Sequence, residues 1–244
     1  MSAAAARRLL RRARSGALAT AYRVPHRAAD GGAADGGEDV WPYTSLVTVA
    51  CDCDAAPLFL LSQLAEHTRN LQTDSRASLL VEEASRRANP QTGPRVTVLG
   101  RIEKSSEEER HRRRFLARHP SAALYAGFAD FAIYRMTIQR VHYVGGFGQA
   151  RWIEGADFGW DAVSAAAIAA AETEIIQHIN AGNAGTLCAR RPPRRGENGW
   201  MVIACDPEGC DLRRGHAIAR LEFPRPAQDP QGVRKALREL GQEP

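Results

Sequence analysis

The sequence lacks two features that would place it in a membrane or in an oxidising compartment. No hydrophobic run approaches the ~20 apolar residues that a membrane-spanning helix needs. The five cysteines among 244 residues are too few, and odd in number, for a disulfide framework. Segment 1–14, rich in Ala and Arg, lacks the serine enrichment of a transit peptide and predicts a short helix that runs into a strand. We therefore expect a cytoplasmic protein with reduced thiols and no membrane partner.

Four of the cysteines come in two pairs. Cys51 and Cys53 alternate on a predicted strand, so we expect both side chains to point to one face. No second pair lies at ligand spacing from them, and we therefore predict no metal site. Cys205 and Cys210 flank the turn DPEG and could face each other across a hairpin.

Clustered basic charge is also missing, although the net charge is +5 and the pI is about 9.2. Arginine is spread along the whole chain and mixed with 28 acidic residues, whereas nucleic-acid binders usually cluster their charge. We predict a solvated basic surface and no nucleic-acid partner; an anionic small ligand fits the same balance. The motifs G-x-S-x-G and H-E-x-x-H and a Cys/His pairing are absent too, so difficult chemistry would need a borrowed cofactor.

Strand-like segments dominate the first 153 residues. A few short helices separate them without regular β-α-β alternation, which predicts an α+β protein built on a barrel-like antiparallel sheet. The stretch 26–39 (HRAADGGAADGGED) predicts a loop, in which the insertion 30–38 is either disordered or a lid. The predicted strands are 16–22, 43–52, 57–62, 77–81, 95–104 and, with a glycine interruption, 131–153.

The character of the sequence changes near residue 160. Segment 161–187 has isoleucines near helical spacing and predicts a strong helix. Strands at 200–205 and 217–223 and a helix at 230–240 follow. We predict two domains, a barrel domain at 1–156 and a small α+β domain at 161–244.

The stretch 60–83 (LLSQLAEHTRNLQTDSRASLLVEE) places several polar groups at the start of a short predicted helix. A strand ends at Ser62, and a helix containing His67, Thr68 and Asn70 follows before the chain returns to strand. Such a helix start leaves backbone N–H groups that favour an anion. The plainer alternative makes Ser62 an N-cap and His67 a surface histidine, and composition alone favours it.

The segment VGGFG (144–148) is followed by strand rather than helix, which excludes a dinucleotide-binding or phosphate-binding loop. We expect it to form a bulge that re-aims Arg151 and Trp152.

Taken in order, the segments SGALAT, PYTSLVTVACD, LSQLAEHTRNL, GPRVTVLGRIEK and GGFGQARWI resemble the FMN-binding split β-barrels of the pyridoxamine-phosphate-oxidase-like family. The similarity covers most of residues 7–153 and is nearest to the haem-utilisation (HugZ-like) branch. The segments AETEIIQHINAGNAGTL and ARLEFPRP resemble the small C-terminal domain of that branch.

The resemblance implies a homodimer that binds FMN in a groove between its subunits, with haem as a further ligand or substrate. By position, Ser62, His67 and Thr68 would hold the flavin phosphate, with Asn70 close by. Ser45 stands where many relatives have a phosphate-binding arginine. The other implied cofactor residues are Arg95, which would face the isoalloxazine ring, and Arg151 and Trp152, which would close the cofactor or substrate side.

Two departures from the family pattern limit what is carried over. The Trp-Gln and Arg-x-His-Asp-Arg segments of true pyridoxamine phosphate oxidases have no counterpart, so we exclude vitamin B6 synthesis. Where the family commonly reads Asn-Ala-Asp-His, this chain has Asn180, Ala181, Gly182 and Asn183. The remaining candidate ligands of haem iron are His142, His178 and His216, and such histidines are more often structural.

Two hypotheses of different class follow from the resemblance. The first is an FMN-dependent oxidoreductase, in its more specific form a protein that binds haem and helps to degrade it for iron utilisation. The alternative is a non-catalytic flavin- or haem-binding regulator of a tetrapyrrole-pathway enzyme.

Overall fold

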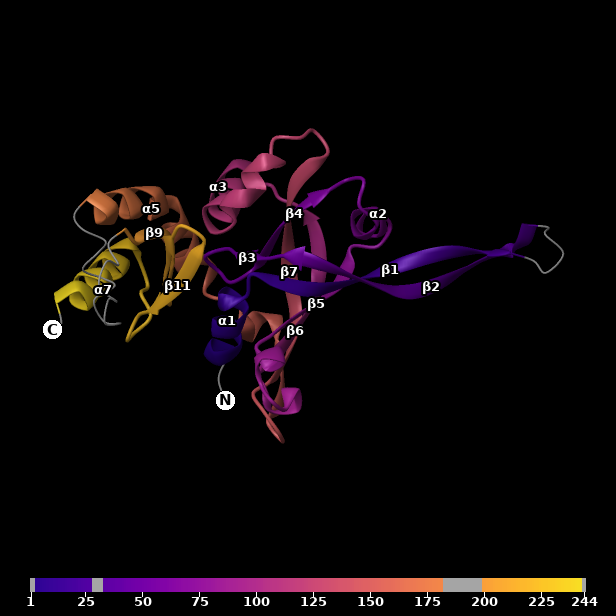
Figure 1. The fold of residues 1–244 in the computed structure, drawn as a ribbon, viewed down its shortest axis with the longest axis horizontal. Helices are drawn as coiled ribbons and strands as arrows, with labels where there is room; N and C mark the ends of the chain where they lie inside the picture. Colours follow the sequence, from indigo (N-terminus) through magenta and orange to yellow (C-terminus); the bar gives the residue numbers. More distant parts are fainter. Residues whose placement is uncertain (1–2, 28–32, 182–198, 243–244) are drawn as a thin grey trace.

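The computed structural model describes residues 3–27, 33–181 and 199–242, which form two antiparallel sheets and the helices around them (Figure 1). None of the helices in these ranges is both long and apolar enough to cross a membrane. The larger sheet contains β1 (Ser15–Arg27), β2 (Ala33–Thr48), β3 (Ala50–Cys51), β4 (Pro57–Ser62), β5 (Arg76–Glu82), β6 (Arg95–Lys104), β7 (Phe131–Val144) and β8 (Ala150–Glu154). The smaller sheet contains β9 (Met201–Asp206), β10 (Gly209–Arg214) and β11 (Ala217–Glu222). The helices are α1 (Ala3–Arg12), α2 (Glu66–Thr73), α3 (Glu108–Arg118), α4 (Gly155–Phe158), α5 (Ala162–Ala181) and α7 (Pro230–Gln242), with short 3₁₀ turns η1 (Ala84–Arg86), η2 (Pro90–Thr92) and η3 (Pro120–Leu124).

The larger sheet curls until its two ends meet. Its strand order is β2-β1-β5-β6-β7-β4-β3, with β8 paired to β7. β2 and β3 lie at opposite ends of this order, yet Val49 alone separates them in the chain, so the sheet must close on itself. Alternating side chains fill the interior; Leu18, Leu79, Val98 and Met136 are fully buried there. The predicted α+β fold with an antiparallel split β-barrel is confirmed.

β1 and β2 continue beyond the barrel as a two-stranded arm, which runs away from the rest of the molecule in Figure 1. β1 pairs with β5 only through Ala17–Ala19, and past that point its strand partner is β2. The prediction of a loop over 26–39 was wrong for 26–27 and 33–39, which are strand. Backbone pairing with a neighbouring strand needs no apolar side chains, so the Gly- and Asp-rich composition of 33–39 gave no sign that these residues form the start of β2. Residues 28–32, the centre of the predicted loop, lie outside the described residues.

The smaller sheet packs with α5 and α7 around a second core that contains Ile168, Ile175, Cys205 and Leu237. Four buried arginines of α1 and α3 reach from the barrel into this part of the chain, in the ion pairs Arg7–Glu208, Arg11–Asp206, Arg114–Glu172 and Arg118–Asp211. The segment between the predicted domains, 157–160, comprises the end of α4 and the turn before α5. The division into domains 1–156 and 161–244 stays a prediction.

Two local predictions are corrected by the structure. Cys51 lies in the barrel core whereas Cys53 lies in the core of the smaller sheet, because the chain leaves β3 directly after Cys51. In the segment VGGFG, Val144 ends β7 and residues 145–148 lie in the turn of the β7–β8 hairpin rather than in a bulge. Gly148 has φ of +72°, which suits glycine. The facing of Cys205 and Cys210 across the β9–β10 hairpin is confirmed by their register.

Candidate ligand-binding site

Ser62 does not cap the helix that follows it. The N-cap of α2 is Ala65, and the hydroxyl of Ser62 instead accepts the Leu64 N–H and donates to the carboxylate of Asp130. The N-cap alternative for Ser62 was therefore wrong, because its partner comes from a segment 68 residues further along the chain. A hydroxyl held by a carboxylate is poorly placed to donate to an anionic phosphate.

The structure brings two of the predicted phosphate-binding residues together at α2. Ser45 Oγ on β2 lies 3.2 Å from His67 Nδ1. Burial lowers the pKa of His67, so at neutral pH its imidazole offers a hydrogen bond but no positive charge. Asn70 Nδ2 donates to Thr20 Oγ1 over 3.0 Å and thereby ties α2 to β1. The hydroxyl of Thr68 is buried and has no hydrogen-bond partner among the described residues.

Arg95, Arg151 and Trp152 do not join this cluster. Arg95 donates to the carbonyls of Gln91 and Gly93 and so holds the loop before β6. Arg151 and Trp152 are neighbours on β8, and successive side chains of a strand point to opposite faces. They therefore cannot both close the same side of one ligand.

Trp152 is part of a stack of three side chains on β7 and β8. Its ring centroid lies 4.6 Å from that of His142, and the guanidinium carbon of Arg140 lies 4.7 Å from the indole centroid. Neither ring nitrogen of His142 has a hydrogen-bond partner within the described part of the chain, and the residue is half-buried. An imidazole in this state can still bind a ligand through one of its nitrogens.

His142 and Trp152 are the last two members of a row of side chains that crosses six strands of the barrel. Each member is the register partner of the next, so all of them lie on one face, which we call the open face. Several are well exposed, Leu46 to 81%, Leu80 to 37% and Trp152 to 46%. In order from β2 to β8 the row is Leu46, Ala17, Leu80, Thr97, His142 and Trp152.

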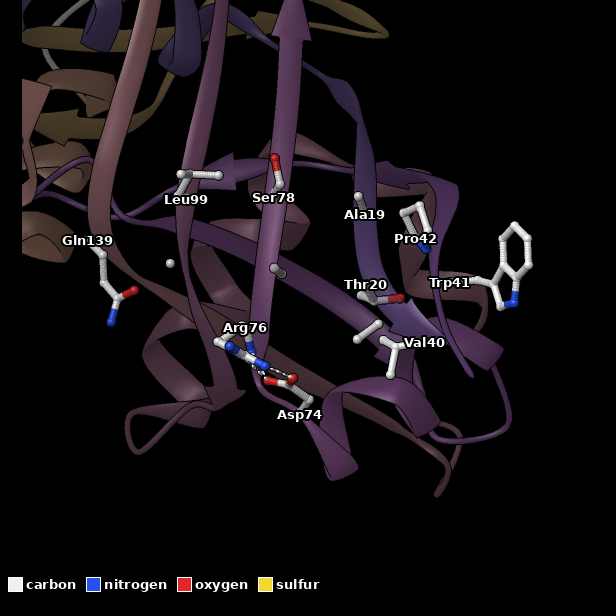
Figure 2. Close-up of a pocket in the computed structure, with 13 residues that line it drawn as sticks. Ala19, Thr20, Val40, Trp41, Pro42, Asp74, Arg76, Ser78, Leu99 and Gln139 are labelled. Atoms are coloured by element: carbon white, nitrogen blue, oxygen red, sulfur yellow. Dashed lines mark hydrogen bonds and ion pairs between the residues drawn. The ribbon is translucent and has the colours of Figure 1, made fainter. Parts of the chain in front are cut away.

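A groove of about 470 Å³ adjoins this row. Ala19, Ser78 and Leu99 line it, each two residues along its strand from a member of the row. Figure 2 shows these side chains beside one another, with the ion pair of Arg76 and Asp74 at one end of the groove. The open face thus combines an apolar surface, a shallow groove and an imidazole, and it can hold a flat, largely apolar molecule.

The other two candidate histidines lie elsewhere. His178 is exposed on α5, and His216 is exposed in the turn between β10 and β11, where its carbonyl accepts a bond from Arg14. Gly182 and Asn183, which mark the departure from the family pattern, lie outside the described residues. Of the three histidines only His142 lies on the open face.

Sequence reasoning missed the open face because strand register is not visible in the sequence. The only sequence signal was the presence of large apolar residues such as Leu80 at positions that alternate with buried ones.

Comparison with known proteins gives one family and several relatives. The family described as "CREG, beta-barrel" matches residues 1–159. The chain is 29% identical over 211 residues to the non-canonical heme oxygenase HOZ, chloroplastic, of Arabidopsis thaliana. This similarity covers 82% of this chain and 64% of that protein, so the chain spans less than two thirds of that relative's length.

Two solved structures are similar over nearly the whole chain. The protein Atu2129 of Agrobacterium tumefaciens, of unknown function, superposes with a TM-score of 0.74 at 28% identity and covers 97% of this chain and 94% of its own. A heme binding protein from Mycobacterium smegmatis has a TM-score of 0.54 at 28% identity and covers 99% of this chain and 96% of its own. The family match extends over more than half of the 244 residues. The chain therefore belongs to the CREG β-barrel family, within the split-barrel superfamily.

Proposed function

We propose that this protein binds haem on the open face of its barrel, with His142 as the ligand of the iron. The observation that carries the proposal is the row from Leu46 to Trp152, a largely apolar strip in which the imidazole of His142 has no hydrogen-bond partner among the described residues. Histidine is a common axial ligand of haem iron.

The surroundings of His142 suit the rest of a haem. Leu80 and Leu99 offer apolar side chains to a flat ring, and burial of such surface is favourable by about 25 cal/mol per Å². Arg140 lies beside the stack; its Nε donates to Glu154 over 2.9 Å, and its other N–H groups can attract a carboxylate at the edge of the ligand. The names of two relatives at 28–29% identity, a heme oxygenase and a heme binding protein, support the same ligand.

We propose further that the bound haem is a substrate for oxidative degradation. Haem iron can activate oxygen once a reductant is supplied, and the protein contributes the axial ligand, the orientation and the polar surroundings. Thr97, the register partner of His142 on β6, offers a hydroxyl on the face where the haem would lie. We place the haem between the open faces of two copies, because a single chain leaves these apolar side chains in water.

FMN is a second candidate ligand, favoured by the buried Thr68 hydroxyl without a partner among the described residues and by the Ser45–His67 contact. The start of α2 would supply N–H groups to the phosphate. The carboxylate of Asp130 on Ser62 opposes an anion there, so the fit to FMN is poorer than the fit to haem.

Haem titration followed at the Soret band tests the main proposal. We expect saturable binding by the wild type and at least tenfold weaker binding by His142→Ala. His178→Ala and His216→Ala are matched controls, since they remove exposed imidazoles away from the open face and should bind like the wild type.

Two results would count against the proposal: equal affinity of His142→Ala and the wild type, or loss of binding in one of the two control variants. The FMN alternative is tested by flavin fluorescence, which is quenched on binding. The variant with both His67→Ala and Thr68→Ala should lose FMN and keep haem.

A further inference from the structure

Three polar side chains form one chain of hydrogen bonds where the end of β6, the start of α3 and the turn after β3 meet. Ser105 Oγ lies 2.6 Å from His111 Nδ1, and His111 Nε2 lies 2.9 Å from Asp52 Oδ2. His111 is 1% exposed and Asp52 5% exposed, whereas Ser105 is half-buried and its neighbour Ser106 is exposed. A hydroxyl, an imidazole and a carboxylate in this order are the groups of an acyl-transfer site, which is recognised by geometry rather than by sequence position.

The bonds around His111 decide which ring nitrogen carries the hydrogen. The carboxylate of Asp52 only accepts, so Nε2 carries the hydrogen and donates it to Oδ2. Nη2 of Arg110 also lies close to Nε2, at 2.6 Å, but a guanidinium cannot accept, and its N–H is directed to Oδ2 at 2.9 Å. Nδ1 of His111 is therefore left with a lone pair toward Ser105, which is the state that a general base needs.

The position of Ser105 suits a nucleophile. Its oxygen accepts the Glu107 N–H over 3.0 Å, which leaves the hydroxyl hydrogen to donate to His111 Nδ1. Ser105 stands between a strand and a helix, since β6 ends at Lys104 and α3 begins at Glu108. The serine nucleophile of α/β-hydrolases also lies in a turn from strand to helix. The first N–H groups of α3 have no acceptor within the helix and point back toward this turn, where they can stabilise an oxyanion.

We propose that Ser105, His111 and Asp52 form a second active site, which hydrolyses esters of small carboxylic acids. Exposed Lys104 and Ser106 flank the nucleophile, so an ester can approach it from solvent, and the half-buried position of Ser105 favours a small acyl group. The site is separate from the proposed haem site, because the chain from Thr97 to Ser105 spans about 25 Å at about 3.3 Å per residue.

Water is the second reactant of the proposed hydrolysis. Ser105 Oγ forms a bond to the carbonyl carbon of the ester while its proton passes to His111 Nδ1. The bond between that carbon and the alcohol oxygen then breaks, and the leaving oxygen takes the proton from Nδ1. Water adds to the acyl-serine by the same route, which releases the acid and restores Ser105. Asp52 orients the imidazole and stabilises the positive charge that it carries between the proton transfers.

A fluorophosphonate probe tests the nucleophile, because it reacts with a serine hydroxyl whose proton a neighbouring base removes. We expect the full chain to gain a single adduct, on the peptide that contains Ser105. Ser105→Ala should lose this adduct and hydrolyse p-nitrophenyl acetate at least about tenfold more slowly than the wild type. Ser106→Ala is the matched control, since it removes the exposed neighbouring hydroxyl and should behave like the wild type in both assays.

His111→Gln tests the base separately. It should slow the labelling of Ser105 at least about a hundredfold, since a general base contributes about 10²–10⁴-fold. Urea unfolding of each variant shows whether it is folded; if buried His111 cannot be replaced without unfolding, the comparison of Ser105→Ala with Ser106→Ala decides. A wild type that gains no adduct, an adduct on Ser106, or equal hydrolysis by Ser105→Ala and the wild type would overturn the proposal. The three side chains would then only hold α3 on the barrel.

Discussion

Removing the carboxylate of Asp206 should destabilise the protein by about 3–5 kcal/mol, the range for breaking a buried ion pair from one side. Asp206 is 1% exposed and binds Arg220 through two bonds of 2.8 Å, and it lies 3.1 Å from Arg11 of α1. Burial alone would raise the pKa of Asp206, but Arg11 and Arg220 outweigh it and hold the pKa well below its usual range. In Asp206→Ala two buried guanidinium groups lose this charge partner, and the Glu208 N–H loses its acceptor.

Equilibrium unfolding in urea measures this loss. With a slope of about 3 kcal/mol per M, the midpoint should fall by about 1–2 M. Glu239→Ala serves as the control, because its pair with Lys235 is exposed and such pairs contribute about 0–1 kcal/mol. A change of less than about 1 kcal/mol in Asp206→Ala would refute the claim that buried charge pairs fasten the barrel to the smaller sheet.

Three further results are expected. Phe115→Ala, which empties a fully buried site on α3, should cost about 3–5 kcal/mol in urea unfolding, whereas Phe147→Ala, at a position 85% exposed, should change little; equal effects would contradict the assigned core. Burial alone would raise the pKa of Asp52, but hydrogen bonds from His111 and Arg110 outweigh it and lower the pKa. The carboxylate therefore stabilises the folded state above its unfolded pKa of about 3.9, and this stabilisation is lost as the pH falls below about 4. Asp52→Asn should flatten the pH dependence of the unfolding free energy, measured in urea between pH 7 and 3. Burial raises the pKa of Cys51 to about 11 and that of Cys53 to about 12, so iodoacetamide at pH 8 should label these thiols only after unfolding, and rapid labelling of the native protein in peptide mass spectra would contradict their burial.

The elements with strong local signals could be predicted from the sequence. Isoleucine spacing marked α5, and the strands predicted at 57–62 and 95–104 are β4 and β6. The arm could not be predicted from its Gly- and Asp-rich half, since its strand conformation comes from pairing with β1 rather than from its own side chains. Pairing with a neighbouring strand here outweighs the low strand propensity of the local sequence.

The candidate site was harder to predict than the fold. The Ser45–His67 contact agrees with the positions carried over from the resemblance, but Ser62 is bound by Asp130, which no local pattern could indicate. The open face depends on the register of six strands, so its members, from Leu46 to Trp152, come together only once the sheet is formed. The buried ion pairs could not be predicted either, because charge spread evenly along the sequence does not indicate which charged groups lie together in the fold.

Hydrogen–deuterium exchange of the protein with and without haem tests the central claim most directly, because it locates the ligand without any substitution. We expect haem to slow exchange in peptides of β5, β6, β7 and β8, which carry the row from Leu80 to Trp152. Exchange in α5 and in the turn that contains His216 should stay unchanged. Slower exchange at α5 or at that turn, with none on the open face, would contradict the account.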